Sequence, residues 1–207
     1  MNRIIFALDV YDREEALNLS KELSDNIFAI KVNWPLVMTN GISIINEISR
    51  YSKVICDFKI ADIDNTNRLI TEKAKENGAW GIITHSFTGK KSLNAVVSAA
   101  GNMKVFSVVA MSQESFIDEH MDELIKMSID ENVYGLVAPG NRPEILRRIR
   151  SMATSLCIIS PGIGAQGGNI IDAITAGADY VIIGRSIYDD PQPIKRLNEI
   201  NKILSDD

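Results

Sequence analysis

Asp57, Lys59 and Asp62 stand at the end of an apolar run and are three of the four charged residues in the stretch DFKIADIDNT, which spans residues 57–66. The run KVICDFKI (53–60) that leads into it is typical of a buried strand. Burying an unpaired charge costs several kcal/mol, so we expect Asp57, Lys59 and Asp62 either to pair with one another or to serve a function. Two residues that are two positions apart project from the same side of a strand, as Asp57 and Lys59 would. A lysine flanked by two acids is held as an ammonium, so this cluster could supply a fixed positive charge and a proton.

A glycine-rich segment, SPGIGAQGG (160–168), forms a second group of candidates together with GRS (184–186). The letters GIGAQG within it match G-x-G-x-x-G, but a dinucleotide site also needs an early βαβ unit and an acid after the next strand. Gly184 and Arg185 follow that strand instead. Glycine lets backbone N–H groups approach a phosphate, a helix N-terminus adds partial positive charge, and the side chains of Gln166 and Arg185 can donate hydrogen bonds. The segment therefore predicts a ligand with a terminal phosphate.

These groups must be positioned by the rest of the chain, in which short apolar runs recur at intervals of 23 to 29 residues. The eight runs are RIIFAL from 3, IFAI from 27, KVICDF from 53, WGIIT from 80, KVFSVV from 104, VYGLV from 133, LCIIS from 156 and YVIIG from 180. Segments with helical periodicity lie between them, at 12–23, 42–49, 65–78 and 168–177, and two of these end in Gly78 and Gly177.

Runs that are continuously apolar are typical of parallel strands buried on both faces. Strand and helix alternating eight times predict an α/β fold, a (β/α)₈ TIM barrel that forms one domain over residues 1–207. A doubly wound open sheet is the alternative.

In such a barrel the chemistry gathers at the C-terminal ends of the strands. Polar residues stand at these positions after all eight predicted strands, which indicates a site; a structural salt-bridge network at the barrel mouth is the alternative. The positions are Asp9, Lys31, Asp57 with Lys59, His85, Ser112, APGN (138–141), SPGIGAQGG (160–168) and Gly184 with Arg185.

Composition narrows the classes of function. A net charge of −5 argues against nucleic-acid binding, and the basic run RPEILRRIR (142–150) is interpreted as a solvated helix face. Cys56 and Cys157 are too few for a disulfide framework or a metal site, so we expect buried free thiols in a reducing compartment. The N-terminal apolar run is too short for a signal peptide, and no run approaches the roughly 18 residues of a membrane span. These features predict a cytoplasmic protein.

With DFKIADI, SPGIGAQGG and IIGRSIY on its third, seventh and eighth predicted strands, the sequence resembles the orotidine 5′-monophosphate decarboxylase family along essentially its whole length. The pattern D-x-K-x-x-D-I-x-x-T at 57–66 is specific to a small group of barrels, and together with Lys31 and the Gln-Gly-Gly loop it is specific to the decarboxylases. The resemblance implies conversion of orotidine monophosphate (OMP) to uridine monophosphate (UMP) and CO₂ in de novo pyrimidine biosynthesis. It also implies that no metal or organic cofactor takes part.

The resemblance also implies roles for individual residues. The catalytic residues would be Lys31, Asp57, Lys59 and Asp62, with Lys59 stabilising and then protonating the C6 carbanion and Asp57 facing the substrate carboxylate. A homodimer is implied, because three residues would reach the site of the partner subunit: Asp62, Ile63 at a pocket wall and Thr66 at the ribose. The remaining contacts would be Asp9 and Lys31 to ribose hydroxyls, Ser112 to the pyrimidine edge, Pro161, Ile83 and Val108 beside the carboxylate, and Gly164, Gln166, Gly184 and Arg185 at the phosphate.

Several residues near these positions are interpreted more plainly. We expect His85 to be a structural hydrogen-bonding residue and His120 to lie on the surface. Asn33 and Trp34 are interpreted as strand-to-helix packing. The segment MSQES (111–115) lacks the Pro-Gly that commonly follows the serine in relatives, which puts the shape of this loop in question.

Two rival functions follow from the same residues. A Mg²⁺-dependent sugar-phosphate aldolase or decarboxylase shares the D-x-K-x-x-D pattern but has a glutamate where Lys31 stands, and a lysine there repels a cation. A non-catalytic protein that binds phosphoribosyl ligands is the other rival. The presence of Lys31, Asp57, Lys59 and Asp62 together argues against it.

Overall fold

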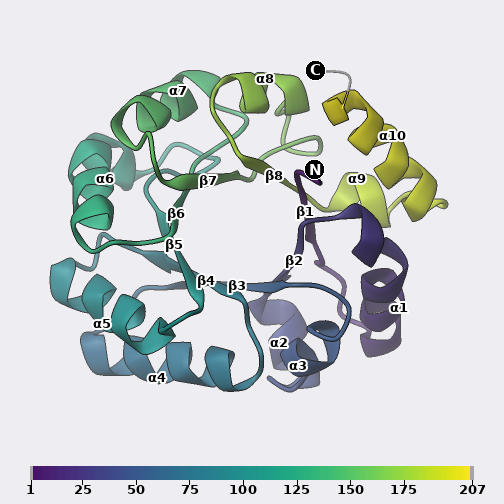
Figure 1. Cartoon of the computed structure of the whole chain (residues 1–207), viewed down its shortest axis with the longest axis horizontal. Coiled ribbons are helices and arrows are strands. Elements are labelled where there is room, and N and C mark those ends of the chain that lie inside the picture. The colour runs from purple at the N-terminus through teal and green to yellow at the C-terminus, as the bar shows by residue number, and fades with distance from the viewer. Residues whose placement is uncertain (1, 206–207) are drawn as a thin grey trace.

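The computed structural model describes residues 2–205 and has eight parallel strands closed into one barrel (Figure 1). The strands are β1 (Ile4–Ala7), β2 (Ala29–Asn33), β3 (Val54–Ile60), β4 (Gly81–His85), β5 (Lys104–Val108), β6 (Gly135–Val137), β7 (Cys157–Ser160) and β8 (Tyr180–Ile183). Each strand pairs with the next along the chain, and β1 pairs with β8 to complete the ring. The predicted (β/α)₈ barrel is confirmed, and the open sheet is excluded.

Helices surround the barrel, as Figure 1 shows. They are α1 (Arg13–Leu23), α2 (Trp34–Asn40), α3 (Ile44–Ile48), α4 (Asp64–Glu76), α5 (Lys90–Ala100), α6 (Met121–Asp130), α7 (Pro143–Met152), α8 (Ile170–Thr175), α9 (Arg185–Tyr188) and α10 (Pro193–Ser205), with short 3₁₀ turns at Ser24–Asn26 and Phe116–His120. The four segments with helical periodicity correspond to α1, α3, α4 and α8. Gly78 and Gly177 adopt φ angles of 84° and 114°, as expected for residues that terminate helices.

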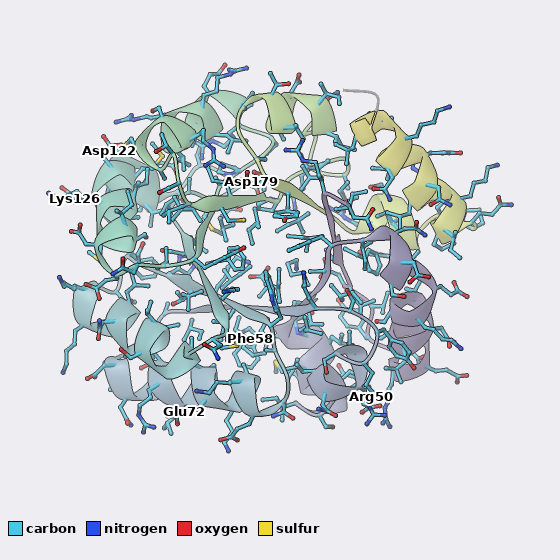
Figure 2. All side chains as sticks on the ribbon, in the orientation of Figure 1. Arg50, Phe58, Glu72, Asp122, Lys126 and Asp179 are labelled. Atoms are coloured by element: carbon cyan, nitrogen blue, oxygen red, sulfur yellow. The ribbon has the colours of Figure 1, made fainter. Side chains whose placement is uncertain are left out.

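Two apolar layers stabilise the fold, which explains why the strands are apolar on both faces. Alternate strand residues such as Ile5 and Phe106 fill the barrel interior, while Ile4 and Phe58 pack between the strands and the helices. Charged side chains such as Asp122 and Lys126 of α6 point outward (Figure 2). Among residues 2–205, no helix combines the length and apolar content that a membrane crossing requires.

Aromatic side chains fill the N-terminal end of the barrel. The rings of Phe28 and Tyr180 stack with centroids 4.0 Å apart, and Trp80 contacts Phe28 and Phe106 edgewise or at a tilt. Gly135 leaves room for this layer, because a Cβ there would lie 2.9 Å from the Phe106 ring and 2.3 Å from a backbone oxygen. An aromatic layer thus packs the barrel interior near the N-terminal ends of the strands.

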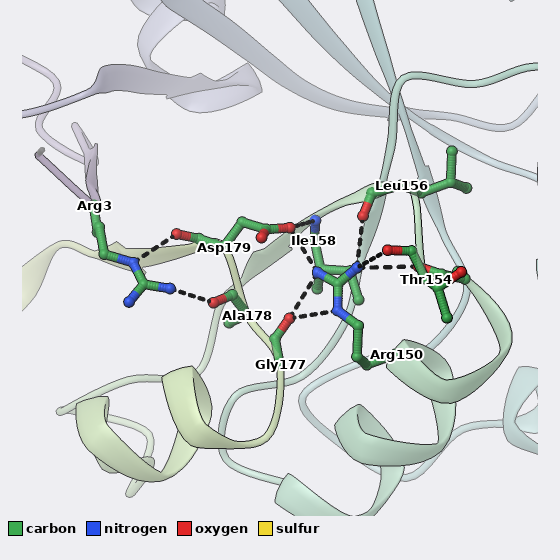
Figure 3. Close-up of polar contacts among 9 residues, drawn as sticks. Arg3, Arg150, Thr154, Leu156, Ile158, Gly177, Ala178 and Asp179 are labelled. Carbon is green, nitrogen blue, oxygen red and sulfur yellow. Dashed lines mark hydrogen bonds and ion pairs between the residues drawn. The ribbon is translucent and has the colours of Figure 1, made fainter. Parts of the chain in front are cut away.

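The basic run at 142–150 has a more structural role than predicted. Arg147 and Arg148 are exposed, as expected for a solvated face. Arg150 instead donates to the backbone carbonyls of Gly177, Ala153 and Leu156 and pairs with Asp179 at 2.6 Å (Figure 3). A guanidinium has five donors in a rigid fork, which is why one side chain can hold two loops together.

The cysteine prediction is right in part. Both thiols are free, Cys56 is buried, and Cys157 is only partly buried. Burial raises the pKa of each thiol to about 12, with a further contribution from Asp57 at Cys56 and from Asp179 at Cys157. Neither thiol is therefore a reactive thiolate near neutral pH.

Candidate active site

A cavity of about 320 Å³ opens at the C-terminal ends of the strands. Residues within or just past each of the eight strands line it. They are Ala7, Asp9, Lys31, Asp57, Lys59, Ile83, Ala110, Met111, Ser112, Gln113, Val137, Pro161, Gly162, Ile163, Ala165, Gln166, Ile182, Gly184 and Arg185. Most of the polar strand ends expected from the sequence thus converge on one hollow, but His85 and the segment APGN (138–141) do not line it. Val108 lies in the core beneath it.

Four charged side chains form a continuous array along one wall of the cavity. Lys31 Nζ lies 3.5 Å from Asp9 Oδ1 and 3.2 Å from Asp57 Oδ2. Lys59 Nζ donates to the other oxygen of Asp57 at 2.7 Å. The formal charges of the four groups cancel, so the array can exist in a site with little water.

Burial makes this array electrostatically strong. The side chains of Lys31 and Asp57 are each only 10% exposed, whereas those of Lys59 and Asp9 are 38% exposed and face the opening. Burial alone would lower the pKa of Lys31, but the charges of Asp57 and Asp9 outweigh it and the pKa is raised. Burial would raise the pKa of Asp57, but Lys31 and Lys59 outweigh it and the pKa is lowered. Both groups are therefore held in their charged forms.

Strand β3 is irregular where it carries the catalytic candidates. Cys56 pairs with Ile82 and Ile60 with Thr84, so β3 has extra residues between these pairs. Lys59 adopts a φ of 42°, one of two positive values outside glycine in residues 2–205. A bulge re-aims a side chain, and a non-glycine residue in this region costs of order 1 kcal/mol. The predicted same-side projection of Asp57 and Lys59 holds, because both line the cavity, although the strand is not regular.

Asn33 and Trp34 support the charged wall from outside the cavity. Trp34 stacks on Phe58 with centroids 4.1 Å apart and donates from Nε1 to the carbonyl of Phe58 at 2.9 Å. This agrees with the packing role expected for Trp34. Asn33 was expected only to pack, but its amide donates to Asp9 Oδ1 at 2.8 Å.

The loop that carries Ser112 is held by residues that follow β6. Asn141 donates to the carbonyl of Ser112 at 2.9 Å. Arg142 donates to the carbonyls on either side, those of Met111 and Gln113, and pairs with Asp118 at 2.9 Å. The loop lacks Pro-Gly but is fixed by these contacts. They could not be predicted from the sequence, because the partners lie about 30 residues apart in the chain.

The glycine-rich loop after β7 closes on itself at the opposite side of the cavity. Gly168 donates to the carbonyl of Gly162 at 3.0 Å, and Gly164 donates to that of Gly168 at 2.9 Å. Gly162 has a φ of 93°, and a Cβ on it would lie 2.5 Å from an oxygen of the neighbouring Asn141 side chain. Gly164 belongs to the loop but does not line the cavity.

Gln166 and Arg185 stand at the rim on this side, and both side chains are exposed. Arg185 forms no ion pair with any acid in the part of the chain that the structure describes. An exposed cation at the mouth beside the Gln166 amide fits an anionic group of a ligand. Its predicted phosphate contact stays a prediction.

Asp62, Ile63 and Thr66 do not line the cavity of their own chain. Asp62 is exposed, and its carboxylate accepts from the backbone N–H of Ile63 at 2.7 Å. Ile63 is 66% exposed. Their predicted roles in a partner's site stay predictions.

His85 lies near the charged array without lining the cavity. Its pKa is lowered from 6.5 to about 4, first by burial and then by the positive charge of Lys59. Its Nδ1 is buried and has no hydrogen-bond partner among residues 2–205. His120, in contrast, is exposed as predicted.

No group of three or more His, Cys, Asp or Glu side chains within residues 2–205 gathers at a spacing that could hold a metal ion. Lys31 fills the space between the acids Asp9 and Asp57, where a cation would need to bind. The prediction of a reaction without metal or cofactor stays a prediction.

The pKa of His85 predicts a pH dependence of stability. Between pH 6.5 and about 4 the unfolded chain binds a proton at this imidazole and the folded chain does not, so the free energy of unfolding should fall as the pH is lowered. Replacing the residue in His85→Gln removes this loss. Urea unfolding across this pH range should therefore show a steeper decline for the wild type than for the variant, while His120→Gln should follow the wild type. Parallel curves for wild type and His85→Gln would contradict the assignment.

Comparison with known proteins supports one family. The model of the orotidine 5′-phosphate decarboxylase / HUMPS family matches residues 2–200. The orotidine 5′-phosphate decarboxylase of Thermoplasma volcanium is 52% identical over 97% of this chain and 92% of its own length, and that of Thermoplasma acidophilum is 51% identical over 99% and 96%.

Solved structures agree with these sequence relatives. Orotidine 5′-monophosphate decarboxylase from Methanocaldococcus jannaschii, complexed with inhibitor BMP, superposes with a TM-score of 0.93 at 39% identity, covering 99% of both chains. The enzyme from Pyrococcus horikoshii OT3 gives 0.90 at 40% identity, covering 98% of this chain and 99% of its own. The chain belongs to the orotidine 5′-phosphate decarboxylase / HUMPS family.

Proposed function

We propose that this protein decarboxylates orotidine 5′-monophosphate to uridine 5′-monophosphate and CO₂, a step of pyrimidine biosynthesis. The observation that carries the proposal is the array of Lys31, Asp57 and Lys59 on one wall of the cavity. The named relatives support it, because their sequences match this chain over nearly its whole length.

The reaction demands a positive charge at one defined carbon. When CO₂ leaves C6 of the pyrimidine, the electron pair of the broken bond stays on C6, where no attached group delocalises it. An ammonium fixed beside C6 stabilises this developing carbanion more than it stabilises the spread charge of the starting carboxylate. Lys59 is the lysine with the more exposed side chain, and after decarboxylation it transfers a proton to C6.

Asp57 and Lys31 act by position. Asp57 accepts from both lysines and so fixes the Lys59 ammonium before substrate arrives, which avoids reorganisation during the reaction. The buried Lys31 neutralises the acid from its other side and, with Asp9, contacts the ribose hydroxyls. Asp57 faces the substrate carboxylate mainly as a positioning group.

The rim at Gln166 and Arg185 would hold the phosphate, where the loops after β7 and β8 line the cavity. Binding energy gained there orients the pyrimidine at the reacting end. Ser112, on the clamped loop, would recognise the pyrimidine edge.

The active form in this proposal is a cytoplasmic homodimer, in which Asp62, Ile63 and Thr66 reach the partner's site. Support comes from their absence from their own cavity and from the exposure of Ile63. The Asp62 segment is also held in place, since Ser92 donates to the Asp62 carbonyl at 2.6 Å.

Loss of the Lys59 amine should abolish turnover. In Lys59→Ala both the electrostatic stabilisation and the proton donor are lost, and we expect kcat to fall by at least about 10⁴-fold. The barrel should stay folded by circular dichroism, because Asp57 keeps Lys31 as a partner. The decrease in ultraviolet absorbance of orotidine monophosphate measures turnover, with Lys73→Ala on the surface of α4 as the control.

Adding a chelator to the same assay distinguishes the proposed enzyme from the rival class of Mg²⁺-dependent enzymes. Wild-type turnover should be unchanged, and activity lost on chelation would instead favour the Mg²⁺-dependent sugar-phosphate enzymes. Near-normal turnover by Lys59→Ala would refute the mechanism, and tight UMP binding without turnover by the wild type would indicate a non-catalytic binding protein.

Arg185→Ala should weaken binding of the nucleotide but hardly that of the nucleoside. A charge-assisted hydrogen bond is worth about 1.5–3 kcal/mol, so the affinity for UMP should fall by about 10- to 100-fold while that for uridine stays within about twofold. Calorimetric titration measures both, with Arg147→Ala on exposed α7 as a matched control. Equal losses for the two ligands would contradict a phosphate contact.

Mixing inactive subunits tests the shared site. A hybrid of Lys59→Ala and Asp62→Ala subunits has one site with both residues intact and one with neither. Random exchange should therefore restore about a quarter of wild-type activity, since half of the dimers are hybrids with one working site. If subunit exchange is verified but no activity is recovered, the shared site is contradicted and the whole site lies within one chain.

A further inference from the structure

Asn33 links the structural frame to the charged wall through both ends of its amide. It ends β2, where it lies beside Asp57 in the parallel pairing, and it caps the N-terminus of α2. Its Oδ1 accepts from the backbone N–H of Leu36 at 3.2 Å. Its Nδ2 donates to Asp9 Oδ1 at 2.8 Å.

The orientation of this amide is dictated by its partners. A carboxylate can only accept and a backbone N–H can only donate, so the NH₂ group must face Asp9 and the oxygen must face Leu36. A flipped amide would place two acceptors together at one end and two donors at the other. Asn33 is thus fixed by chemistry as well as by packing.

The hydrogen bond from Asn33 fixes the orientation of the Asp9 carboxylate. Asp9 Oδ1 accepts a hydrogen bond from Asn33 Nδ2 at 2.8 Å and lies 3.5 Å from Lys31 Nζ. Asp9 Oδ2 accepts no hydrogen bond from the described residues, and the side chain is 38% exposed on the cavity. One oxygen is therefore anchored while the other is left for a ligand.

We propose that Asn33 is a positioning residue that holds Asp9 with its free oxygen toward the ribose, and so sets the preference of the site for ribose over deoxyribose. The inference rests on the proposed function, in which Asp9 binds a ribose hydroxyl. A site built to hydrogen-bond a hydroxyl rejects an analogue that lacks it, provided that the partner oxygen is held in place. Without Asn33, Asp9 can turn toward solvent and the discrimination weakens.

Two substitutions separate this role from helix capping. Serine and aspartate both cap helices well, so Asn33→Ser and Asn33→Asp should keep the bond to Leu36 and a near-normal melting temperature. Serine is too short to reach Asp9. Aspartate has the shape of asparagine but turns an acceptor toward the Asp9 carboxylate, which repels it.

The experiment measures binding of UMP and of its 2′- and 3′-deoxy analogues by calorimetric titration. We expect Asn33→Ser to weaken UMP binding by about tenfold and to leave binding of the analogue that lacks the Asp9-bound hydroxyl within about twofold, so that the ribose preference shrinks. Asn33→Asp should weaken UMP binding further. Asn40→Ser, at the other end of α2, removes an amide that bonds only backbone carbonyls and should keep the wild-type preference.

A double substitution shows whether Asn33 acts through Asp9. In an Asp9→Ala background, Asn33→Ser should cause no additional loss of UMP affinity. The proposal is overturned if Asn33→Ser leaves UMP affinity unchanged, if it weakens all three ligands equally, or if its full effect persists without Asp9. Because the readout is binding, it is independent of turnover, and a wild type that binds UMP but releases no CO₂ would refute only the proposed function.

Discussion

One carboxylate shared by two ammonium groups is the constraint on which the site depends. Asp57 is nearly buried and accepts from Lys31 on one side and Lys59 on the other. Removing it would leave a buried ammonium dependent on Asp9 alone, and an uncompensated buried charge costs about 3–5 kcal/mol. The array follows three adjacent strands of a closed barrel, whose spacing of about 4.8 Å brings neighbouring side chains within reach. A less rigid frame could not hold these distances.

The backbone of β3 shows that the position of Lys59 is imposed by its surroundings. A positive φ at a lysine has an energetic cost, and it persists only where neighbouring contacts fix it. Those contacts are the ion pair with Asp57 and the anchoring of the adjacent Phe58 by Trp34, which stacks on its ring and bonds its carbonyl. The strained backbone of Lys59, its ion pair with Asp57 and the stacked rings of Trp34 and Phe58 therefore act together. Packing outside the barrel in this way directs the Lys59 amine into the cavity.

The sequence predicted those features that depend on local pattern. The continuous apolar runs predicted the eight strands. The two-residue spacing of Asp57 and Lys59 predicted that their side chains project from the same side of β3. The bulge at Lys59 could not be predicted, since no glycine marks it. The roles of Asn33 and Arg142 were also missed, because their partners Asp9 and Asp118 lie 24 residues away in the chain for each pair and meet only once the barrel closes. Arg150 was predicted to lie on a solvated helix face for the same reason, because its partner Asp179 is also distant in the chain.

The two sides of the cavity differ in how firmly they are held. The charged wall is tied by ion pairs, a stacked ring and Asn33, whereas the rim at Gln166 and Arg185 is exposed and forms few contacts of its own. Electrostatic interactions strengthen as water is excluded, and Lys59 is still 38% exposed. In the proposed reaction the wall thus gains its full effect only when a ligand covers it. In the same proposal, phosphate binding at the rim would supply the binding energy that holds the ligand over the wall, while the preformed wall stabilises the charge that develops in the reaction.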